Sequence, residues 1–251
     1  MNERDTMAIV VLAAGLGTRM KSDKAKVLHC LSKRPMISYV IERAKEIVGI
    51  ENVVVVVGHQ AEAVRQEVMK QGPALFAHQA EQNGTGHAVW CALDQLPQAA
   101  AEILILCGDV PLLTAQTLKD LIKIHRKENR DLTLLTVKLE TPTGYGRIIQ
   151  DSRGNAVKIV EEADATDSEK AIDIVNAGIY CVKKDFLKSS LSRIDSDNAQ
   201  KELYLTDIIE VACSQKKKVG MLMTADPNEV VGVNSVEDLT RAEALLGDQS
   251  L

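Results

Sequence analysis

The sequence predicts an α/β protein built on a doubly wound, mostly parallel β-sheet. Apolar runs of strand length recur along about the first 140 residues, and segments with helical periodicity separate them. The runs are apolar at every position rather than at alternate positions, which is typical of strands buried on both faces. Glycine and small polar residues directly follow several runs, at the sheet edge where open α/β folds bind ligands. Any functional site is therefore expected at the carboxyl ends of the strands.

The first elements alternate between strand and helix. Residues 7–14 form a continuous apolar stretch that ends at Gly15, and they predict the first strand. Pro35 begins a segment whose apolar positions recur at helical spacing up to Val48. The five valines 53–57 predict the next strand, and the order strand, helix, strand is the unit of a parallel sheet.

The same alternation continues to about residue 140. The expected elements are a helix over 61–70, a strand over 74–78, a helix ending near 96, a strand over 103–107, a helix capped by Thr114, and a strand over 132–139. Right-handed crossovers between these parallel strands would make the sheet doubly wound.

Beyond about residue 140 the pattern changes to turns and shorter strands. Residues 141–200 predict a small antiparallel insertion that walls one side of a pocket, with strands over 156–161 and 172–182. The remaining elements are helices near 183–190 and 204–214, a strand over 219–224, and a final helix begun by Ser235 with Asp238. No repeat, low-complexity segment or linker is evident, so residues 1–251 are expected to form one domain.

Composition restricts the classes of function. A chain of 251 residues, 45% of them hydrophobic, can bury a full core. The net charge of -5 and the 3% of aromatic residues disfavour a nucleic-acid partner. Five widely spaced cysteines without a Cys-x-x-Cys pair favour reduced thiols in a cytoplasmic protein. The apolar runs are too short to span a membrane, and Glu3 and Asp5 disfavour a signal peptide.

The loop after the first strand is a candidate phosphate site. Gly15 and Gly17 let backbone N–H groups approach an anion closely, and Arg19 adds a planar, permanently charged donor. The dinucleotide fingerprint would need a third glycine at Met20, and the P-loop would need Gly-Lys-Ser/Thr. Gly-x-Gly alone is equally consistent with a tight strand-to-helix turn.

Asp109 is the strongest single candidate for chemistry. It follows a buried apolar strand and Gly108, so its carboxylate is expected at the same sheet edge as the glycine loop. A carboxylate there can bind Mg2+ and, through the metal, triphosphate oxygens. The alternative is an aspartate that stabilises the turn before Pro111. Asn234 and Gln79 are ambiguous on their own, since they could be a helix cap and a surface residue.

These segments resemble the sugar-1-phosphate nucleotidyltransferases. The resemblance rests on Leu12-Ala-Ala-Gly-Leu-Gly-Thr-Arg-Met20, on Lys26-Val-Leu-His29 and on Leu-Cys-Gly-Asp-Val-Pro around Asp109, and it spans about residues 7–246. Within the family the chain is most similar to the uridylyltransferase half of the bacterial bifunctional enzyme that makes UDP-N-acetylglucosamine, a precursor of cell-wall peptidoglycan. The implied fold is the Rossmann-like sheet of nucleotide-diphospho-sugar transferases. The implied activity is Mg2+-dependent transfer of UMP from UTP to N-acetylglucosamine 1-phosphate, with release of pyrophosphate.

The resemblance also implies a role for individual residues. Arg19 and Lys26 would steady the triphosphate, because cations offset the repulsion between two reacting phosphates and no side-chain nucleophile is needed. Asp109 and Asn234 would hold Mg2+. The nucleotide would contact Leu12, Ala13, Ala14 and Gly15, with Gln79, Gly84 and Thr85 at the uracil. The sugar would contact Gly146, Glu161 and Asn176, and the segment 202–207 would close over it. His59 and His87 are expected to be structural.

Several positions depart from the family pattern. Ala25 stands where a proline usually precedes the lysine, so we expect a less rigid loop around Lys26. Cys107 replaces an aromatic residue beside the metal site, and Ala177 replaces a commoner threonine. The sequence has no hexapeptide-repeat acetyltransferase domain before it stops at Leu251, so acetyl transfer is not expected, and the oligomeric state is left open between a monomer and a weak dimer.

Two alternatives remain open. The same scaffold could serve glucose 1-phosphate, glucosamine 1-phosphate or dTTP, because a few pocket substitutions change the substrate. The chain could also be a non-catalytic regulatory protein on this fold. The joint presence of Arg19, Lys26, Asp109 and Asn234 argues against that alternative, since a binding module would not need the whole set.

Overall fold

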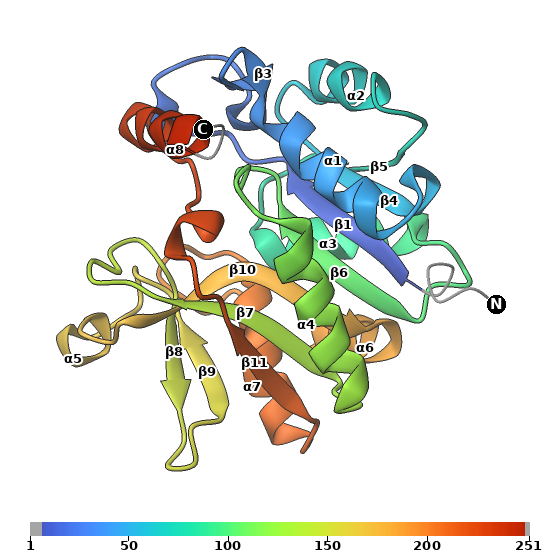
Figure 1. Cartoon of the computed structure of the whole chain (residues 1–251). Coiled ribbons are helices and arrows are strands. Elements are labelled where there is room, and N and C mark those ends of the chain that lie inside the picture. Colours follow the sequence, from blue (N-terminus) through green and yellow to red (C-terminus); the bar gives the residue numbers. More distant parts are fainter. Residues whose placement is uncertain (1–6, 249–251) are drawn as a thin grey trace.

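The computed structural model describes residues 7–248, so Glu3, Asp5 and both ends of the expected domain lie outside the described residues. A twisted central sheet runs through the molecule with helices on its two faces (Figure 1). The strand order is β11 (Val219–Met223), β7 (Leu132–Lys138), β10 (Ile174–Lys183), β6 (Glu102–Cys107), β1 (Met7–Ala13), β4 (Val53–Val57) and β5 (Leu75–His78). The predicted doubly wound, mostly parallel α/β fold is confirmed.

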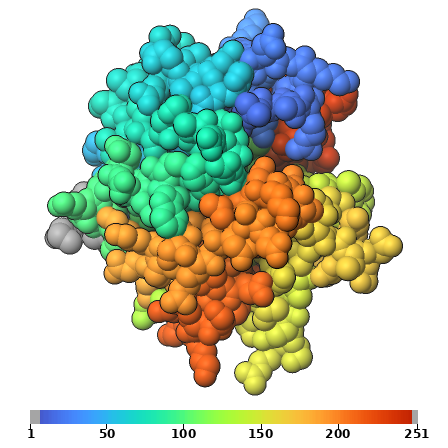
Figure 2. Space-filling model, turned by 180° about the vertical axis from the view of Figure 1, so that it is seen from behind, coloured from blue at the N-terminus to red at the C-terminus, as the bar shows by residue number. Residues whose placement is uncertain are grey.

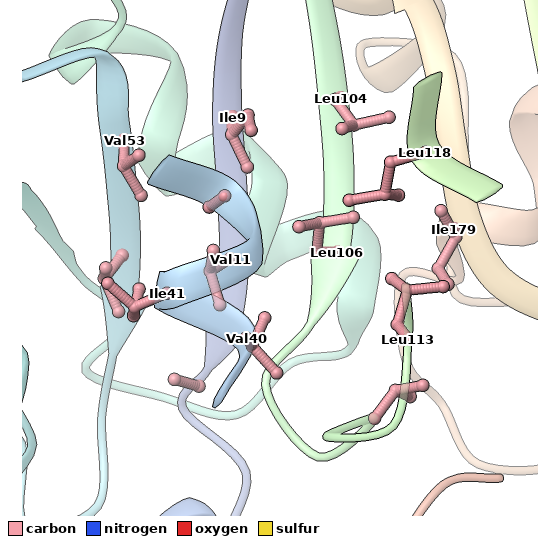
Figure 3. Packing of buried hydrophobic residues seen from close by; sticks show 14 of the residues in the cluster. Ile9, Val11, Val40, Ile41, Val53, Leu104, Leu106, Leu113, Leu118 and Ile179 are labelled. Atoms are coloured by element: carbon pink, nitrogen blue, oxygen red, sulfur yellow. The ribbon is translucent and has the colours of Figure 1, made fainter. Parts of the chain in front are cut away.

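Strand β1 lies at the centre of the sheet and pairs in parallel with β4 and β6. Its residues alternate between two apolar layers, so both faces are buried, as the continuous apolar run predicted. Ile9 and Val11 pack in one layer with Ile41 of α1 (Met36–Ile47) and Leu118 of α4 (Ala115–Lys127) (Figure 3). In the opposite layer Val10 packs with residues of α3 (Thr85–Ala92). This rigid centre carries the loops at its carboxyl end.

The helices begin where the sequence signals predicted. The Thr114 side chain accepts a 3.2 Å hydrogen bond from the Thr117 amide and caps α4. At the start of α8 (Val236–Asp248), Ser235 and Asp238 each donate a backbone hydrogen bond to the other's side chain, at 2.9 and 3.2 Å. The other helices are α2 (Ala61–Met69), α5 (Asp167–Lys170), α6 (Lys184–Leu191) and α7 (Ile208–Ser214).

The antiparallel part of the fold differs in one respect from expectation. Strand β10 does not lie outside the main sheet; it fills the place between β6 and β7 and runs antiparallel to both. The reason is its apolar content, since Val175, Ile179, Cys181 and Val182 are fully buried between the two helical layers. The short strands β8 (Arg147–Gln150) and β9 (Ala156–Val160) extend from it as a small antiparallel ribbon.

Two short strands before α1, β2 (Cys30–Leu31) and β3 (Arg34–Pro35), were not expected from the sequence. All five cysteines are free thiols. Between Met7 and Asp248, no helix combines the length and the apolar content that crossing a membrane would need.

Candidate active site

A cavity of about 370 Å3 opens at the carboxyl ends of β1 and β6, the sheet edge at which the sequence predicted a site. The amide of Gly108 donates a 2.9 Å hydrogen bond to the carbonyl oxygen of Leu12, and this bond joins the ends of the two strands. The predicted site residues that line the cavity are Leu12, Ala13, Ala14, Gly15, Lys26, Gln79, Gly84, Thr85 and Asp109. Cys107 and Glu202 line it too.

A larger cavity of about 750 Å3 lies at the opposite edge of the sheet, next to Glu102 and Lys183. Charged groups in it are paired within the chain: Arg126 bonds Glu102, and Lys183 bonds Asp131. The volume of a cavity therefore does not identify the candidate site. The smaller cavity is the candidate because the loops at the carboxyl ends of the strands converge on it.

The glycine loop turns back onto Lys26. Gly17 has a φ of 66°, and a Cβ atom there would lie only 2.6 Å from Cβ of Lys26, so both conformation and space require glycine. Gly15, in contrast, faces open space. Arg19 follows on an exposed 3-10 turn, η2 (Thr18–Met20), and its guanidinium has no hydrogen bond or ion pair with the described residues. Arg19 is thus available to a ligand, although it does not line the cavity.

Lys26 lies between Asp109 and Asn234. Its ammonium group donates a short hydrogen bond to Oδ2 of Asp109 and a 3.0 Å hydrogen bond to Oδ1 of Asn234. The amide of Val233 donates to the carbonyl oxygen of Asp109 at 2.9 Å and holds the two chain segments together. The Asn234 side chain donates from Nδ2 to the carbonyl of Gly232 at 3.2 Å, which turns Oδ1 toward Lys26.

This donor set fits a divalent metal ion. Oδ2 of Asp109 and Oδ1 of Asn234 already converge on one positive charge, and both are hard oxygen donors. Within residues 7–248 no group of three or more His, Cys, Asp or Glu side chains could hold a metal. A metal bound by Asp109 and Asn234 would complete its ligand shell with water and substrate phosphates, which is how Mg2+ is commonly held.

Gln79 is buried, only 3% exposed, and not the surface residue that its sequence context alone would suggest. Nε2 of its amide donates to the carbonyl oxygen of Gly84 at 3.0 Å and lies 3.2 Å from Nδ1 of His87. Within the described part of the chain Oε1 accepts no hydrogen bond. The amide therefore presents its acceptor to the cavity. Nδ1 of His87 also lies 3.1 Å from the carbonyl oxygen of Glu81, so the ring lies between this carbonyl and the Gln79 amide.

The segment 202–206 packs against the loop that carries Gly84 and Thr85. Figure 2 shows the corresponding orange and green parts of the surface in contact. Gly84 has a φ of 103°, and a Cβ atom there would lie 2.5 Å from the carbonyl oxygen of Leu203. Thr85 accepts a 3.0 Å hydrogen bond from the amide of Leu205 through Oγ1. Gly84 and Thr85 thus have a packing role beside the predicted nucleotide contact, which the sequence did not reveal.

The three predicted sugar residues lie together beside this site. The backbone N–H of Asn176 donates to the carbonyl oxygen of Gly146 at 2.9 Å. A Cβ atom on Gly146 would lie 3.2 Å from Oε2 of Glu161, so these two residues are also close. Oγ1 of Thr206 donates a 2.9 Å hydrogen bond to Oε1 of Glu161. Glu161 itself lines a separate cavity of about 480 Å3.

Asn176 is held at both ends of its side-chain amide. Nδ2 donates to the Tyr180 hydroxyl at 2.6 Å, and Oδ1 accepts from the Gly178 amide at 3.0 Å. Cys107 connects this group to the first cavity, because its thiol donates to the carbonyl of Gly178 at 3.4 Å. The two halves of the candidate site are therefore linked through Gly178.

Burial shifts the pKa values of three groups at the site. It raises the pKa of Cys107 to about 12, so this thiol stays protonated and is not a nucleophile. It also raises the pKa of Glu161, although the hydrogen bond from Thr206 acts in the opposite direction. Burial, together with the nearby carboxylates of Asp195 and Glu161, raises the pKa of Asp207 to about 6.

The chain is similar to known proteins along most of its length. A family model described as nucleotidyl transferase matches residues 8–242. The chain is 46% identical over 239 residues to the bifunctional protein GlmU of Trichlorobacter lovleyi. The aligned region covers 95% of this chain and 52% of that protein. It is 44% identical to the bifunctional protein GlmU of Desulfotalea psychrophila, over 97% of this chain and 71% of that protein. The chain thus spans about half the length of several of the relatives it matches.

The fold has solved counterparts. The crystal structure of UDP-glucose pyrophosphorylase complexed with UDP-glucose superposes with a TM-score of 0.74 over 97% of this chain and 99% of that one. Sequence identity in that pair is 16%, so the likeness concerns the fold alone.

Proposed function

The chain belongs to the nucleotidyl transferase family, and from this premise we propose that it transfers UMP from UTP to N-acetylglucosamine 1-phosphate. The products would be UDP-N-acetylglucosamine and pyrophosphate. The family predicted from the sequence motifs is confirmed. Those motifs and the similarity to relatives named bifunctional protein GlmU support the choice of UTP and of this sugar phosphate. We propose that the described residues act as one transferase domain.

The observation that carries the proposal is the convergence of Lys26, Asp109 and Asn234 at the cavity of the glycine loop. One cationic and two oxygen-donor side chains meet there from segments far apart in the sequence. Such a cluster serves a reaction between two anions better than a binding-only site, which would not need metal ligands beside a lysine.

The proposed reaction forms and breaks one P–O bond each. A phosphate oxygen of the sugar 1-phosphate attacks the α-phosphorus of UTP, while the bond from that phosphorus to the oxygen bridging the α- and β-phosphates breaks. Pyrophosphate leaves with the electron pair. Lys26 and Arg19, whose guanidinium has no partner within residues 7–248, offset the negative charge that both reactants bring. Mg2+, held by Asp109 and Asn234 when bound, would add charge neutralisation on the phosphates.

The remaining residues orient the two substrates. Oε1 of Gln79 can accept a hydrogen bond from N3–H of uracil, because Nε2 of its amide is engaged by the carbonyl oxygen of Gly84. Thymine presents the same edge, so dTTP belongs among the nucleotides tested. Glu161 can accept hydrogen bonds from sugar hydroxyls, with its carboxylate oriented by Thr206.

The test is pyrophosphate release with Mg2+ and either UTP or dTTP, against the 1-phosphates of N-acetylglucosamine, glucose and glucosamine. Asp109→Asn is measured alongside, with Asp120→Asn on the exposed side of α4 as the matched control. Release that is strongest with UTP and N-acetylglucosamine 1-phosphate and lost only in Asp109→Asn supports the proposal. Release with another sugar would keep the mechanism and change the acceptor. No release with any sugar, despite UTP binding, would favour a regulatory protein.

A further inference from the structure

The loop in front of Lys26 is held by one side chain from another part of the chain, Gln60. Oε1 of Gln60 accepts a 3.0 Å hydrogen bond from the amide of Ala25. Nε2 of the same side chain donates a 2.9 Å hydrogen bond to the carbonyl oxygen of Asp23. Both ends of one amide therefore bind the backbone of the residues that immediately precede Lys26.

The bond to Ala25 satisfies a buried donor. Ala25 is 1% exposed and begins the 3-10 turn η3 (Lys26–Leu28), in which its carbonyl accepts a hydrogen bond from the Leu28 amide. Without Gln60 the Ala25 amide would have no partner among the described residues, and a buried N–H without a partner is strongly unfavourable. The turn that carries Lys26 thus depends on this contact.

Gln60 lies between the sheet and α2. It stands three residues after the end of β4, whose five valines are fully buried, and its carbonyl accepts a hydrogen bond from the Val64 amide in the first turn of α2. Its backbone is left-handed, with φ 49° and ψ 41°, which is unfavourable for a residue with a Cβ. The two hydrogen bonds of its side chain help to stabilise this conformation. His59 also contacts the carbonyl of Asp23, at 2.9 Å.

We propose that Gln60 is a positioning residue for Lys26, because its side chain clamps residues 23–25 and so sets where the ammonium group meets Asp109 and Asn234. The proposal rests on the proposed function for its effect on turnover. It also explains how Ala25 is accommodated before Lys26. Ala25 has a φ of -52°, which is within the range of proline. Unlike proline, alanine carries a backbone N–H, and this group needs a hydrogen-bond acceptor. Gln60 supplies that acceptor.

The first variant is Gln60→Ala, with Gln66→Ala on the exposed side of α2, the helix that follows Gln60, as the matched control. We expect kcat for UMP transfer to fall about tenfold in Gln60→Ala, as for the loss of a hydrogen bond to a buried donor. The KM for the sugar 1-phosphate should stay within twofold of wild type, because Glu161 and Asn176 lie on other segments. Exchange of the Ala25 amide with solvent should become at least about tenfold faster. Gln66→Ala should change none of these quantities.

The second variant is the rescue Gln60→Ala with Ala25→Pro. Proline removes the N–H that Gln60→Ala leaves without a partner and restricts φ to values near that of Ala25. We expect kcat to return to within about threefold of wild type. Such a recovery would identify the Ala25 N–H as the group through which Gln60 acts.

Three results would overturn the proposal: unchanged Ala25 exchange in Gln60→Ala, unchanged kcat in that variant while the wild type is active, or no recovery in the double variant. If the wild type transfers no nucleotide, the proposed function fails instead. UTP affinity measured by calorimetry then decides the role of Gln60, which requires weaker binding in Gln60→Ala and recovery with Ala25→Pro.

Discussion

The ammonium group of Lys26 donates a 3.0 Å hydrogen bond to Oδ1 of Asn234, although 208 positions separate the two residues in the sequence. The same ammonium group also donates to Asp109. In the proposed site Lys26 and Mg2+ would therefore share two oxygen ligands. In the free protein the ammonium group binds the Asp109 carboxylate and the Asn234 amide oxygen. When substrate is bound, the same ammonium group could also contact the phosphates.

Lys26→Met should separate metal binding from turnover. Methionine keeps the apolar stem of the side chain and removes the charge that shares Asp109 and Asn234 with a metal. We expect kcat to fall on the order of 100-fold, because a donor to the reacting phosphates is lost. We also expect Mn2+, used as a calorimetric probe without nucleotide, to bind at least about fivefold more tightly. Lys45→Met, at an exposed site on α1, is the control, and equal Mn2+ affinity in both variants would contradict shared ligands.

Thr206→Val should impair the sugar side of the site. Valine has a similar shape but cannot donate the 2.9 Å hydrogen bond to Glu161, so the pKa of this buried carboxyl should rise further above its ordinary value. The KM for the sugar 1-phosphate should increase about fivefold to tenfold, and the acidic limb of its pH profile should move to higher pH. Steady-state kinetics across pH measure both. Thr240→Val, at an exposed position of α8, should leave them unchanged, and equal profiles in the two variants would refute the role of Thr206.

Asp207 should make stability depend on pH. Its pKa is about 6 in the folded chain against 3.8 as its ordinary value, because burial and neighbouring carboxylates disfavour the charged form. Between pH 3.8 and about 6 the folded chain keeps a proton on Asp207 that the unfolded chain has lost. The contribution of Asp207 to stability is therefore fully present below pH 3.8 and is lost as pH rises through about 6.

Asp207→Asn should remove this dependence. The variant should be more stable than wild type at pH 7 by about 1 kcal/mol, a figure reduced for the partial exposure of the carboxyl. The difference should vanish near pH 4, as measured by urea unfolding at both pH values. Asp197→Asn is the control, since that side chain is 93% exposed. A constant difference at all pH values would show that Asp207 does not titrate as described.

Gly84→Ala should disturb the nucleotide side through a steric clash. A Cβ atom at Gly84 would meet the Leu203 backbone at 2.5 Å, in addition to the strain of a φ of 103°. Gly154 is the matched control, because its φ is 80° and a Cβ there would meet nothing within 4 Å. We expect Gly154→Ala to cost about 1 kcal/mol of stability through strain alone, and Gly84→Ala to cost about 2 to 4 kcal/mol and to weaken UTP binding. Equal unfolding free energies would contradict the clash.

Much of the fold follows from the sequence because its signals are local. The apolar run of β1, the five valines of β4 and the caps at Thr114 and Ser235 depend on residues that lie close together along the chain. The position of Asp109 at the end of β6 follows from the same logic, since parallel strands expose their carboxyl ends at one edge.

Other features depend on contacts between segments that lie far apart in the sequence. Strand β10 pairs with both β6 and β7, which precede it by many residues, and no local sequence pattern predicts this position in the sheet. The burial of Gln79 and the bond from Leu205 to Thr85 likewise arise from segments that meet only after folding.

By itself, the sequence determined the class of the fold, the family and the residue types at the candidate site. Only the tertiary structure decided that Lys26 stands between Asp109 and Asn234 and that Gln60 holds the loop before it. The physical reason is the distance along the sequence over which each kind of interaction acts. Periodicity and capping reflect interactions within a few residues, whereas a hydrogen bond between distant residues depends on the packing of every element that separates them.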